Sequence, residues 1–181
     1  MDACVLYPAS VRDTLLSLAD QGLYRPKWSR KIQEEWKRNL SEARPDIPEA
    51  ILDSTILQMD KAFPDAEIEN FEEIVPSLSL PDPNDNHVLA ASIVGKVDVI
   101  VTYNTKDFPQ SYVSNYHIEV VDPDTFMVNL IDLNPELALR AIQKQSERLK
   151  DPPKTVNEVI DTLEVKGLVN AAAKFRTLVN S

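Results

Sequence analysis

The sequence predicts an α/β fold with a parallel sheet. Val97–Thr102 is rich in β-branched residues and is typical of a buried strand, and His117–Val121 predicts a second strand. A short helix over Asn86–Val94 precedes the first of them. Strand and helix joined by brief connections are typical of a doubly wound sheet, in which the strands run parallel.

The N-terminal part predicts a short strand over Ala3–Leu6 and then three helices. Phe71–Val75 is a further candidate strand, and the proline-bounded stretch Pro76–Pro83 is expected to be a loop. Each helix is placed by a capping residue, by proline in the first turn or by glycine just past the end. The expected helices are Val11–Gln21 with Ser10 as N-cap and Gly22 after it, Arg30–Leu40 behind Ser29, and Pro48–Ala62.

The chain after Asp122 is expected to be wholly helical. Gly167 separates the last two helices, which we interpret as an appended hairpin. We therefore expect one α/β domain over residues 1–130 and a helical extension over residues 131–181. The expected helices lie near 123–131, 135–150, 155–166 and 168–179.

The composition excludes several kinds of site. Three glycines are too few for the clustered glycines of GxGxxG and Walker A loops. Two histidines and one cysteine exclude a zinc site built from Cys and His. No apolar run approaches the roughly 18 residues of a membrane span. The lone Cys4 and the lack of a basic, then apolar, N-terminal leader predict a cytoplasmic protein.

The net charge of −10 is unevenly distributed. Residues 46–86 carry eleven acids and one base, whereas the stretch Arg25–Arg44 carries seven bases and three acids. That stretch could offer a basic face to a polyanion, and a solvated, charged helix face explains it equally well.

Four acidic residues are expected at one edge of the predicted sheet. Functional residues of open α/β sheets gather outside the carboxyl ends of the strands. Each acid also has a simpler explanation: a solvated terminus for Asp2, a buried ion pair with Lys or Arg for Glu35, an N-cap for Asp85 and a turn for Asp107. Together, four converging carboxylates repel one another unless a divalent cation lies between them. Oxygen ligands alone select Mg²⁺ or Mn²⁺.

Four segments of this chain, in this order and spacing, resemble the PIN-domain nucleases and in particular their VapC-like toxin branch. The resemblance covers roughly residues 1–130 and is carried by Asp2–Pro8, Trp28–Trp36, Pro81–Ala91 and Val99–Pro109. It implies a three-layer α/β/α domain with a central parallel sheet and extra C-terminal helices. It also implies a Mg²⁺- or Mn²⁺-dependent endoribonuclease that cuts single-stranded or loop RNA.

The resemblance assigns the metal to Asp2, Glu35, Asp85 and Asp107. The resemblance also implies that Asn104 lines the same site, and it leaves the fourth position open between Asn104 and Asp107. Thr102 is placed behind the ligands, in hydrogen-bonding distance of them. A cognate antitoxin protein and a second copy of the chain are the implied partners.

One departure from the family keeps an alternative function open. Family members carry several apolar residues before the first Asp, whereas Met1 alone precedes Asp2. The start could lie upstream, the N-terminus could be trimmed, or the first strand could be short. A short strand would favour a degenerate module that binds RNA or a protein without cleavage.

Other acidic-site folds and other candidate residues fit less well. A phosphatase of the haloacid type needs Asp-x-Asp, and Cys4 stands two residues after Asp2. A phosphoaspartate receiver needs paired acids early in the chain, and Asp2 has no acidic neighbour. Burial as a small hydrophobe explains Cys4 better than nucleophilic chemistry, and capping or a solvent-facing position explains His87 better than a role in the site.

Overall fold

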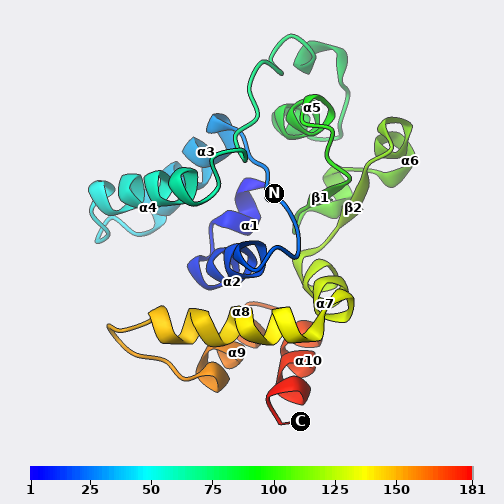
Figure 1. Ribbon diagram of the computed structural model, residues 1–181. Coiled ribbons are helices and arrows are strands. Elements are labelled where there is room, and N and C mark those ends of the chain that lie inside the picture. The colour runs from blue at the N-terminus through cyan, green and yellow to red at the C-terminus, as the bar shows by residue number, and fades with distance from the viewer. Residues whose placement is uncertain (181) are drawn as a thin grey trace. The chain divides into compact units, whose positions relative to one another are not determined.

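The computed structural model describes residues 1–180, which form two compact units (Figure 1). The first, called the sheet unit, consists of Met1–Tyr7 and Pro26–Asp122. The second, called the helical unit, consists of Pro8–Arg25 and the chain from Pro123 onward. The division into domains over residues 1–130 and 131–181 stays a proposal. The two compact units do not test it, because a compact unit is not the same as a segment that folds by itself.

The sheet unit contains two parallel strands, β1 (Val99–Val101) and β2 (Glu119–Val121). Their register pairs Val101 with Val121. The backbone N–H of Asp2 donates to the carbonyl of Val101 at 3.1 Å, so the N-terminal segment lies along β1. The parallel pairing of the two expected strands is confirmed, although each is shorter than its predicted range. The three-layer arrangement stays a prediction.

The expected strand over Ala3–Leu6 is wrong, because these residues form the short helix α1 (Ala3–Leu6). Asp2 has an extended backbone and caps this helix, its carboxylate accepting the N–H of Ala3 at 2.6 Å. The turn closes where the N–H of Tyr7 donates to the carbonyl of Ala3 at 2.9 Å. An aspartate that caps the next turn has therefore overridden the strand propensity of a short apolar run.

The expected strand over Phe71–Val75 is also wrong. The N–H of Ile74 donates to the carbonyl of Phe71 at 3.1 Å, which makes this stretch a turn. The 3-10 helix η1 (Val75–Ser77) follows directly. Pro76, which directly follows the run, lies inside η1 and lacks the N–H that a strand continuing there would donate.

The three helices expected in the sheet unit are confirmed, the one over Asn86–Val94 with its expected bounds and the other two with shifted ends. Ser29 caps the first of them as predicted, its hydroxyl accepting the N–H of Ile32 at 3.3 Å. The following helix begins one residue later than expected, behind Pro48. The bounds are α3 (Arg30–Ala43), α4 (Glu49–Ala62), α5 (Asn86–Val94) and α6 (Gln110–Val113), with 3-10 helices η2 (Pro83–Asp85), η3 (Thr105–Asp107) and η4 (Ser114–Tyr116).

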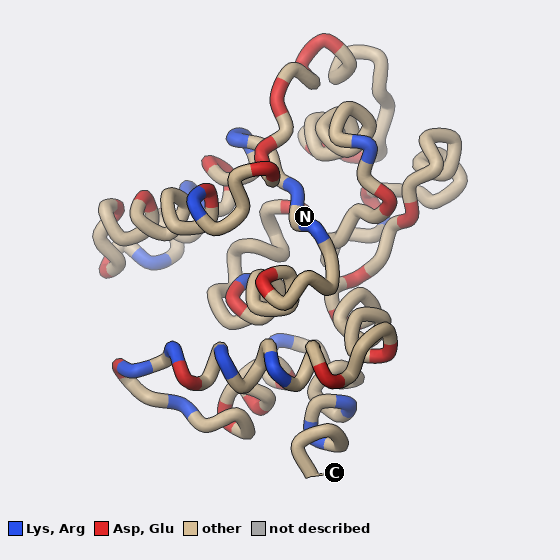
Figure 2. The backbone as a smooth tube through the Cα atoms, in the orientation of Figure 1, with Lys and Arg blue, Asp and Glu red and all other residues tan. Residues whose placement is uncertain are grey.

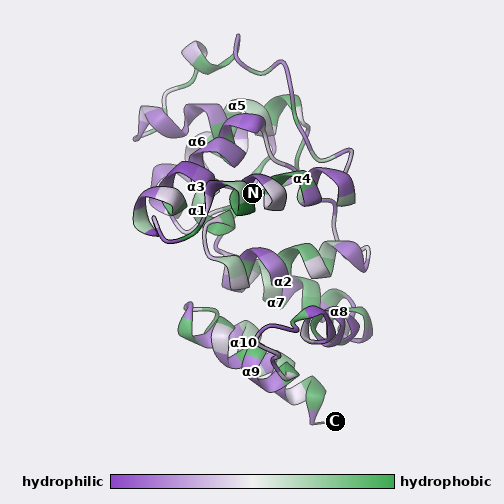
Figure 3. Ribbon diagram, turned by 90° about the vertical axis from the view of Figure 1, so that its left-hand side faces the viewer, coloured by the Kyte–Doolittle hydropathy of each residue, from purple (hydrophilic) through white to green (hydrophobic). Residues whose placement is uncertain are grey.

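The helical unit joins an N-terminal helix to the C-terminal ones. Hydrophobic and hydrophilic residues alternate along these helices, as expected when one face of each lies in a core (Figure 3). The hydroxyl of Thr14 donates to Gln145 at 2.9 Å, which ties the N-terminal helix to α8. The helices are α2 (Ala9–Asp20), α7 (Pro123–Leu133), α8 (Pro135–Arg148), α9 (Val156–Val165) and α10 (Val169–Val179).

The ends of these helices lie within two residues of the expected ones, and one expected cap is wrong. Gly22 and Gly167 follow α2 and α9 with φ of 80° and 88°, a conformation that favours glycine. The expected cap at Ser10 is wrong, because α2 begins earlier, with Pro8 at the N-cap position. None of the helices within residues 1–180 is long and apolar enough to cross a membrane.

The Ser29 cap of α3 gives a first prediction. Ser29→Ala is expected to lower the free energy of unfolding by about 1 kcal/mol, because the N–H of Ile32 loses its partner. Urea denaturation followed by circular dichroism measures the difference. The control is Ser54→Ala, an exposed position inside α4, where higher helix propensity makes the change neutral or slightly stabilising. Equal losses in both variants would contradict the capping role of Ser29.

Candidate active site

The four predicted acids come from four elements of the sheet unit. Asp2 precedes α1 and lies against β1, and Glu35 is on α3. Asp85 ends η2 just before α5, and Asp107 ends η3 just after β1. The structure therefore takes one carboxylate from each of four segments that are far apart in the sequence.

The pKa of Asp85 shows that these carboxylates share one electrostatic neighbourhood. Burial is the largest cause of its rise to about 7, and the negative charges of four other acids add to it. A nearby carboxylate disfavours the charged form of Asp85, so each of these acids is close enough to repel it. In order of effect they are Asp2, Asp82, Asp107 and Glu35.

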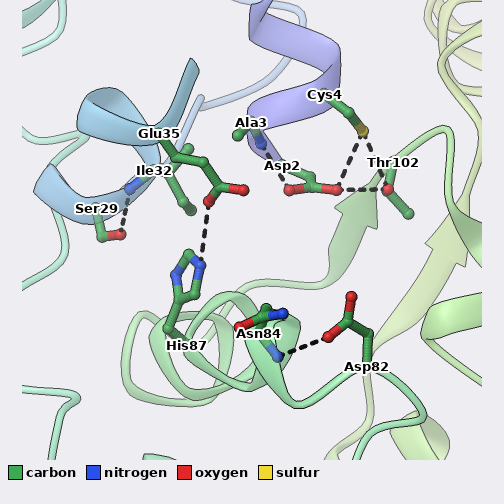
Figure 4. A network of polar contacts seen from close by, with 10 residues as sticks. All are labelled: Asp2, Ala3, Cys4, Ser29, Ile32, Glu35, Asp82, Asn84, His87 and Thr102. Atoms are coloured by element: carbon green, nitrogen blue, oxygen red, sulfur yellow. Dashed lines mark hydrogen bonds and ion pairs between the residues drawn. The ribbon is translucent and has the colours of Figure 1, made fainter. Parts of the chain in front are cut away.

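Asp2 is the most firmly held of these acids. One carboxylate oxygen accepts the N–H of Ala3 at 2.6 Å, and the other accepts the hydroxyl of Thr102 at 2.6 Å and the thiol of Cys4 at 3.1 Å (Figure 4). Its side chain is buried, so the explanation of Asp2 as a solvated terminal acid is wrong. Three donors to one buried carboxylate fix its orientation.

Two neighbours of Asp2 have supporting functions. Thr102 is fully buried, and its hydroxyl also accepts the N–H of Asn104 at 3.0 Å, so it links β1 to the next turn. Burial and the charge of Asp2 raise the pKa of the Cys4 thiol to about 12. Cys4 is therefore a protonated donor to Asp2 at neutral pH and not a nucleophile.

Glu35 points toward Asp2 and pairs with His87 (Figure 4). The Nε2 atom of His87 lies 3.3 Å from a carboxylate oxygen of Glu35. This hydrogen bond is the largest cause of the lowered pKa of Glu35, and Lys31 and Arg38 lower it further. The expected Lys or Arg partner of Glu35 is therefore replaced by a histidine.

The solvent-facing position expected for His87 is wrong, because His87 is only 2% exposed. All residues of α5 from Asn86 to Ser92 are buried, so a side chain in its first turn has no solvent side. The sequence of α5 consists mostly of small and apolar residues and has no polar face. This pattern was the signal that could have indicated burial on every side of the helix.

Asp82 is a further acid near Asp85 that the sequence did not indicate. Its carboxylate accepts the N–H of Asn84 at 2.9 Å, which caps η2, and its charge raises the pKa of Asp85. Asp85 itself makes no capping hydrogen bond, so its explanation as a simple N-cap is wrong. Two acids three residues apart across a proline turn were the signal that could have indicated Asp82.

Asp107 lies in the turn expected for it. Its N–H donates to the carbonyl of Asn104 at 2.9 Å, closing η3. The turn does not exclude a role in the site, because the charge of Asp107 also raises the pKa of Asp85. The shared assignment of the fourth position to Asn104 and Asp107 stays a prediction.

The donor chemistry of the site fits a hard divalent cation. The converging acids supply only oxygen ligands, and burial together with the charges of the neighbouring acids raises the pKa of Asp85, a cost that a cation would offset. Within residues 1–180, no three His, Cys, Asp or Glu side chains are arranged as a ready-made metal centre. A bound ion would therefore have to draw these carboxylates closer together.

An open cavity of about 690 Å³ lies beside the site. Its lining includes His87, Phe71 and the two basic residues Arg30 and Lys31. Acidic residues of the 67–72 segment line it as well, so its charge is mixed. His87 thus borders this cavity and also contacts Glu35.

Comparison with known proteins gives two family matches and one curated relative. Residues 1–106 match the family described as PIN domain, and residues 123–177 match the family described as VapC50 C-terminal domain. The chain is 36% identical over 97 residues to a protein of Mycobacterium tuberculosis (strain ATCC 25618 / H37Rv) named "Putative ribonuclease VapC50". The alignment covers 54% of this chain and 57% of that relative, little more than half of each. No solved structure matches the chain.

The raised pKa of Asp85 gives a second prediction, for the metal-free protein. The folded chain holds this proton up to about pH 7, whereas the unfolded chain releases it near 3.8. Between these values the unfolded state binds fewer protons, so the contribution of Asp85 to the free energy of unfolding falls as the pH rises.

Asp85→Asn is expected to remove the decrease in the free energy of unfolding that Asp85 causes as the pH rises. Urea denaturation at pH 5 and pH 8 measures this decrease. A carbon NMR titration of the unaltered protein should give a midpoint near 7 for the Asp85 carboxyl group. Asp98→Asn, at an exposed position, is the control and should keep the pH dependence of the unaltered chain. An Asp85 midpoint near 4 would contradict the crowding of carboxylates.

Proposed function

The chain belongs to the PIN domain family, on its VapC-like branch, and from that premise we propose that it is a metal-dependent ribonuclease. Its substrate would be single-stranded or loop RNA, whose phosphodiester bonds it hydrolyses. The observation that supports this proposal is the crowding of acidic side chains around Asp85, expressed in its raised pKa. Such crowding of negative charges lowers the stability of a folded protein unless a bound cation neutralises them.

Asp2, Glu35, Asp85 and Asp107 are the residues that would hold Mg²⁺ or Mn²⁺. When bound, the ion supplies positive charge for the transition-state oxygens and lowers the pKa of water. The chain's own contribution is orientation: Asp2 is held by three donors, and Glu35 is anchored by His87. Asp85 or Asp107 would accept a hydrogen bond from the attacking water and direct it at the phosphorus.

The proposed RNA path runs along α3. Figure 2 shows Lys and Arg interspersed with Asp and Glu along α3 and α4. Three of the seven basic residues of this region are paired with acids: Arg30 with Asp60 and Glu67, Lys37 with Glu49 and Asp53, and Arg44 with Asp46. The charges of Lys31 and Arg38 act on Glu35. These two exposed residues lie beside the site and are the best placed to contact a phosphate backbone.

The proposed cellular role is that of the toxin of a toxin–antitoxin pair in the cytoplasm. Its partners would be a cognate antitoxin protein and a second copy of the chain. The support is the relative named a ribonuclease and the two family matches.

A second candidate is a degenerate module that binds RNA or a protein without cleaving. The lack of a ready-made metal centre within residues 1–180 favours it. Calorimetry with Mn²⁺ on the full chain separates the two candidates. Mn²⁺ binding together with RNA cleavage supports the nuclease. The absence of both Mn²⁺ binding and cleavage supports the degenerate module.

The nuclease proposal gives a third prediction. Asp85→Asn and Glu35→Gln are each expected to reduce the rate of RNA cleavage at least a hundredfold, because each removes a charge that the ion requires. Cleavage of a labelled single-stranded RNA with Mn²⁺ measures this, with circular dichroism as the check on folding. Glu34→Gln, at an exposed position beside Glu35, is the matched control and should keep full activity. Full activity in Asp85→Asn would end the nuclease proposal.

The proposed RNA path gives a fourth prediction. Lys31→Gln and Arg38→Gln should each reduce the slope of log K against log salt by about 0.7, because each removes one contact to single-stranded phosphate. Fluorescence anisotropy with a short RNA, in an Asp85→Asn background that prevents cleavage, measures the slope. Lys37→Gln is the control, since Lys37 is paired with Glu49 and Asp53. A larger effect at Lys37 than at Lys31 would contradict the path.

A further inference from the structure

His87 contributes one polar atom to the candidate site from a buried position. Its ring is 2% exposed, and its Nε2 atom lies 3.3 Å from Glu35, while its buried Nδ1 atom has no hydrogen-bond partner within residues 1–180. The ring is therefore held by packing on one side and by a single polar contact on the other. That contact leads to one of the proposed metal ligands.

We propose that His87 is a positioning residue, which holds the carboxylate of Glu35 toward Asp2 by donating the Nε2–H hydrogen bond. This inference rests on the proposed nuclease function. His87 itself would touch neither the metal nor the RNA. It would act through Glu35 alone.

Glu35 needs such an anchor because its side chain is long and 30% exposed. A glutamate on a helix surface populates several rotamers, and fixing one of them costs conformational entropy. Lys31 and Arg38 attract its charge from the same helix. The bond to His87 favours the rotamer that Figure 4 shows, in which the Glu35 carboxylate points toward Asp2.

His87 is suited to this task because its own position is fixed. It lies in the first turn of α5, and its neighbours Val88 and Leu89 are buried. With Nδ1 unpartnered, no hydrogen bond of the described residues competes for the orientation of the ring. A rigid donor of this kind behind a metal ligand raises metal affinity, and its loss typically weakens binding about 10- to 100-fold.

A merely structural role of His87 is the competing explanation, and two variants of equal length separate it from positioning. Gln places its Nε2 atom as many bonds from Cα as His does and keeps an N–H donor. Met has the same reach without a donor. If His87 only filled space, His87→Gln and His87→Met would behave alike.

The experiment measures Mn²⁺ binding by calorimetry on the full chain, together with RNA cleavage. We expect His87→Met to weaken Mn²⁺ binding at least tenfold and His87→Gln to restore it to within about threefold of the unaltered protein. The control is His117→Asn, at an exposed position with φ of 59° that Asn tolerates, and it should bind Mn²⁺ normally. Equal affinities in His87→Met and His87→Gln, whether high or low, would overturn the proposal.

A second measurement keeps the proposal testable if a His87 variant does not fold. Nitrogen NMR of the histidine side chains in the unaltered protein should show Nε2 of His87 protonated and slow to exchange, and Glu35→Ala should shift that signal while the His117 signal stays unchanged. An unshifted His87 signal would overturn the contact. A failure of the nuclease proposal is distinguishable, because the unaltered protein would then lack Mn²⁺ binding and cleavage while the His87 signal still responded to Glu35→Ala.

Discussion

The candidate site depends on mutual repulsion between carboxylates that the fold brings together. Asp85 is the clearest reporter, because burial and four neighbouring acids raise its pKa to about 7. A fold that minimised its free energy alone would separate these charges or place a lysine among them. Retaining them lowers stability locally and creates a place where a divalent cation would be favoured, which is the relation between stability and function expected of an active site.

The scaffold offsets this repulsion by supplying donors to individual carboxylates. Asp2 receives a backbone N–H, the Thr102 hydroxyl and the Cys4 thiol, and Glu35 receives the imidazole of His87. Two of these donors come from elements whose positions are set by burial: Thr102 follows β1, and His87 lies on the buried helix α5. The apolar packing of the sheet unit thus fixes the orientation of the polar donors at its edge. This allows a small parallel sheet to support a candidate site with several charges.

Surface charge in this protein is arranged in pairs that leave part of α3 available. The acidic segment over residues 46–86 supplies partners for Arg30, Lys37 and Arg44, so three of the seven basic residues of Arg25–Arg44 are paired. Exposed pairs of this kind add little to stability. The charges of Lys31 and Arg38, also on α3, act instead on Glu35.

The sequence by itself determined the parallel strands, the helices after Asp122 and the cap at Ser29, because periodicity, capping and turn signals act over a few residues. The choice of Asp2, Glu35, Asp85 and Asp107 came from their places in the expected fold and from the resemblance, and their roles stay predictions. The tertiary structure alone decided that residues 3–6 are helical, that His87 is buried against Glu35 and that Asp82 adds to the crowding at Asp85. Each of these depends on which distant segment lies alongside. Local propensity carries no information on such contacts, and the burial that results from them sets both hydrogen-bond partners and pKa values.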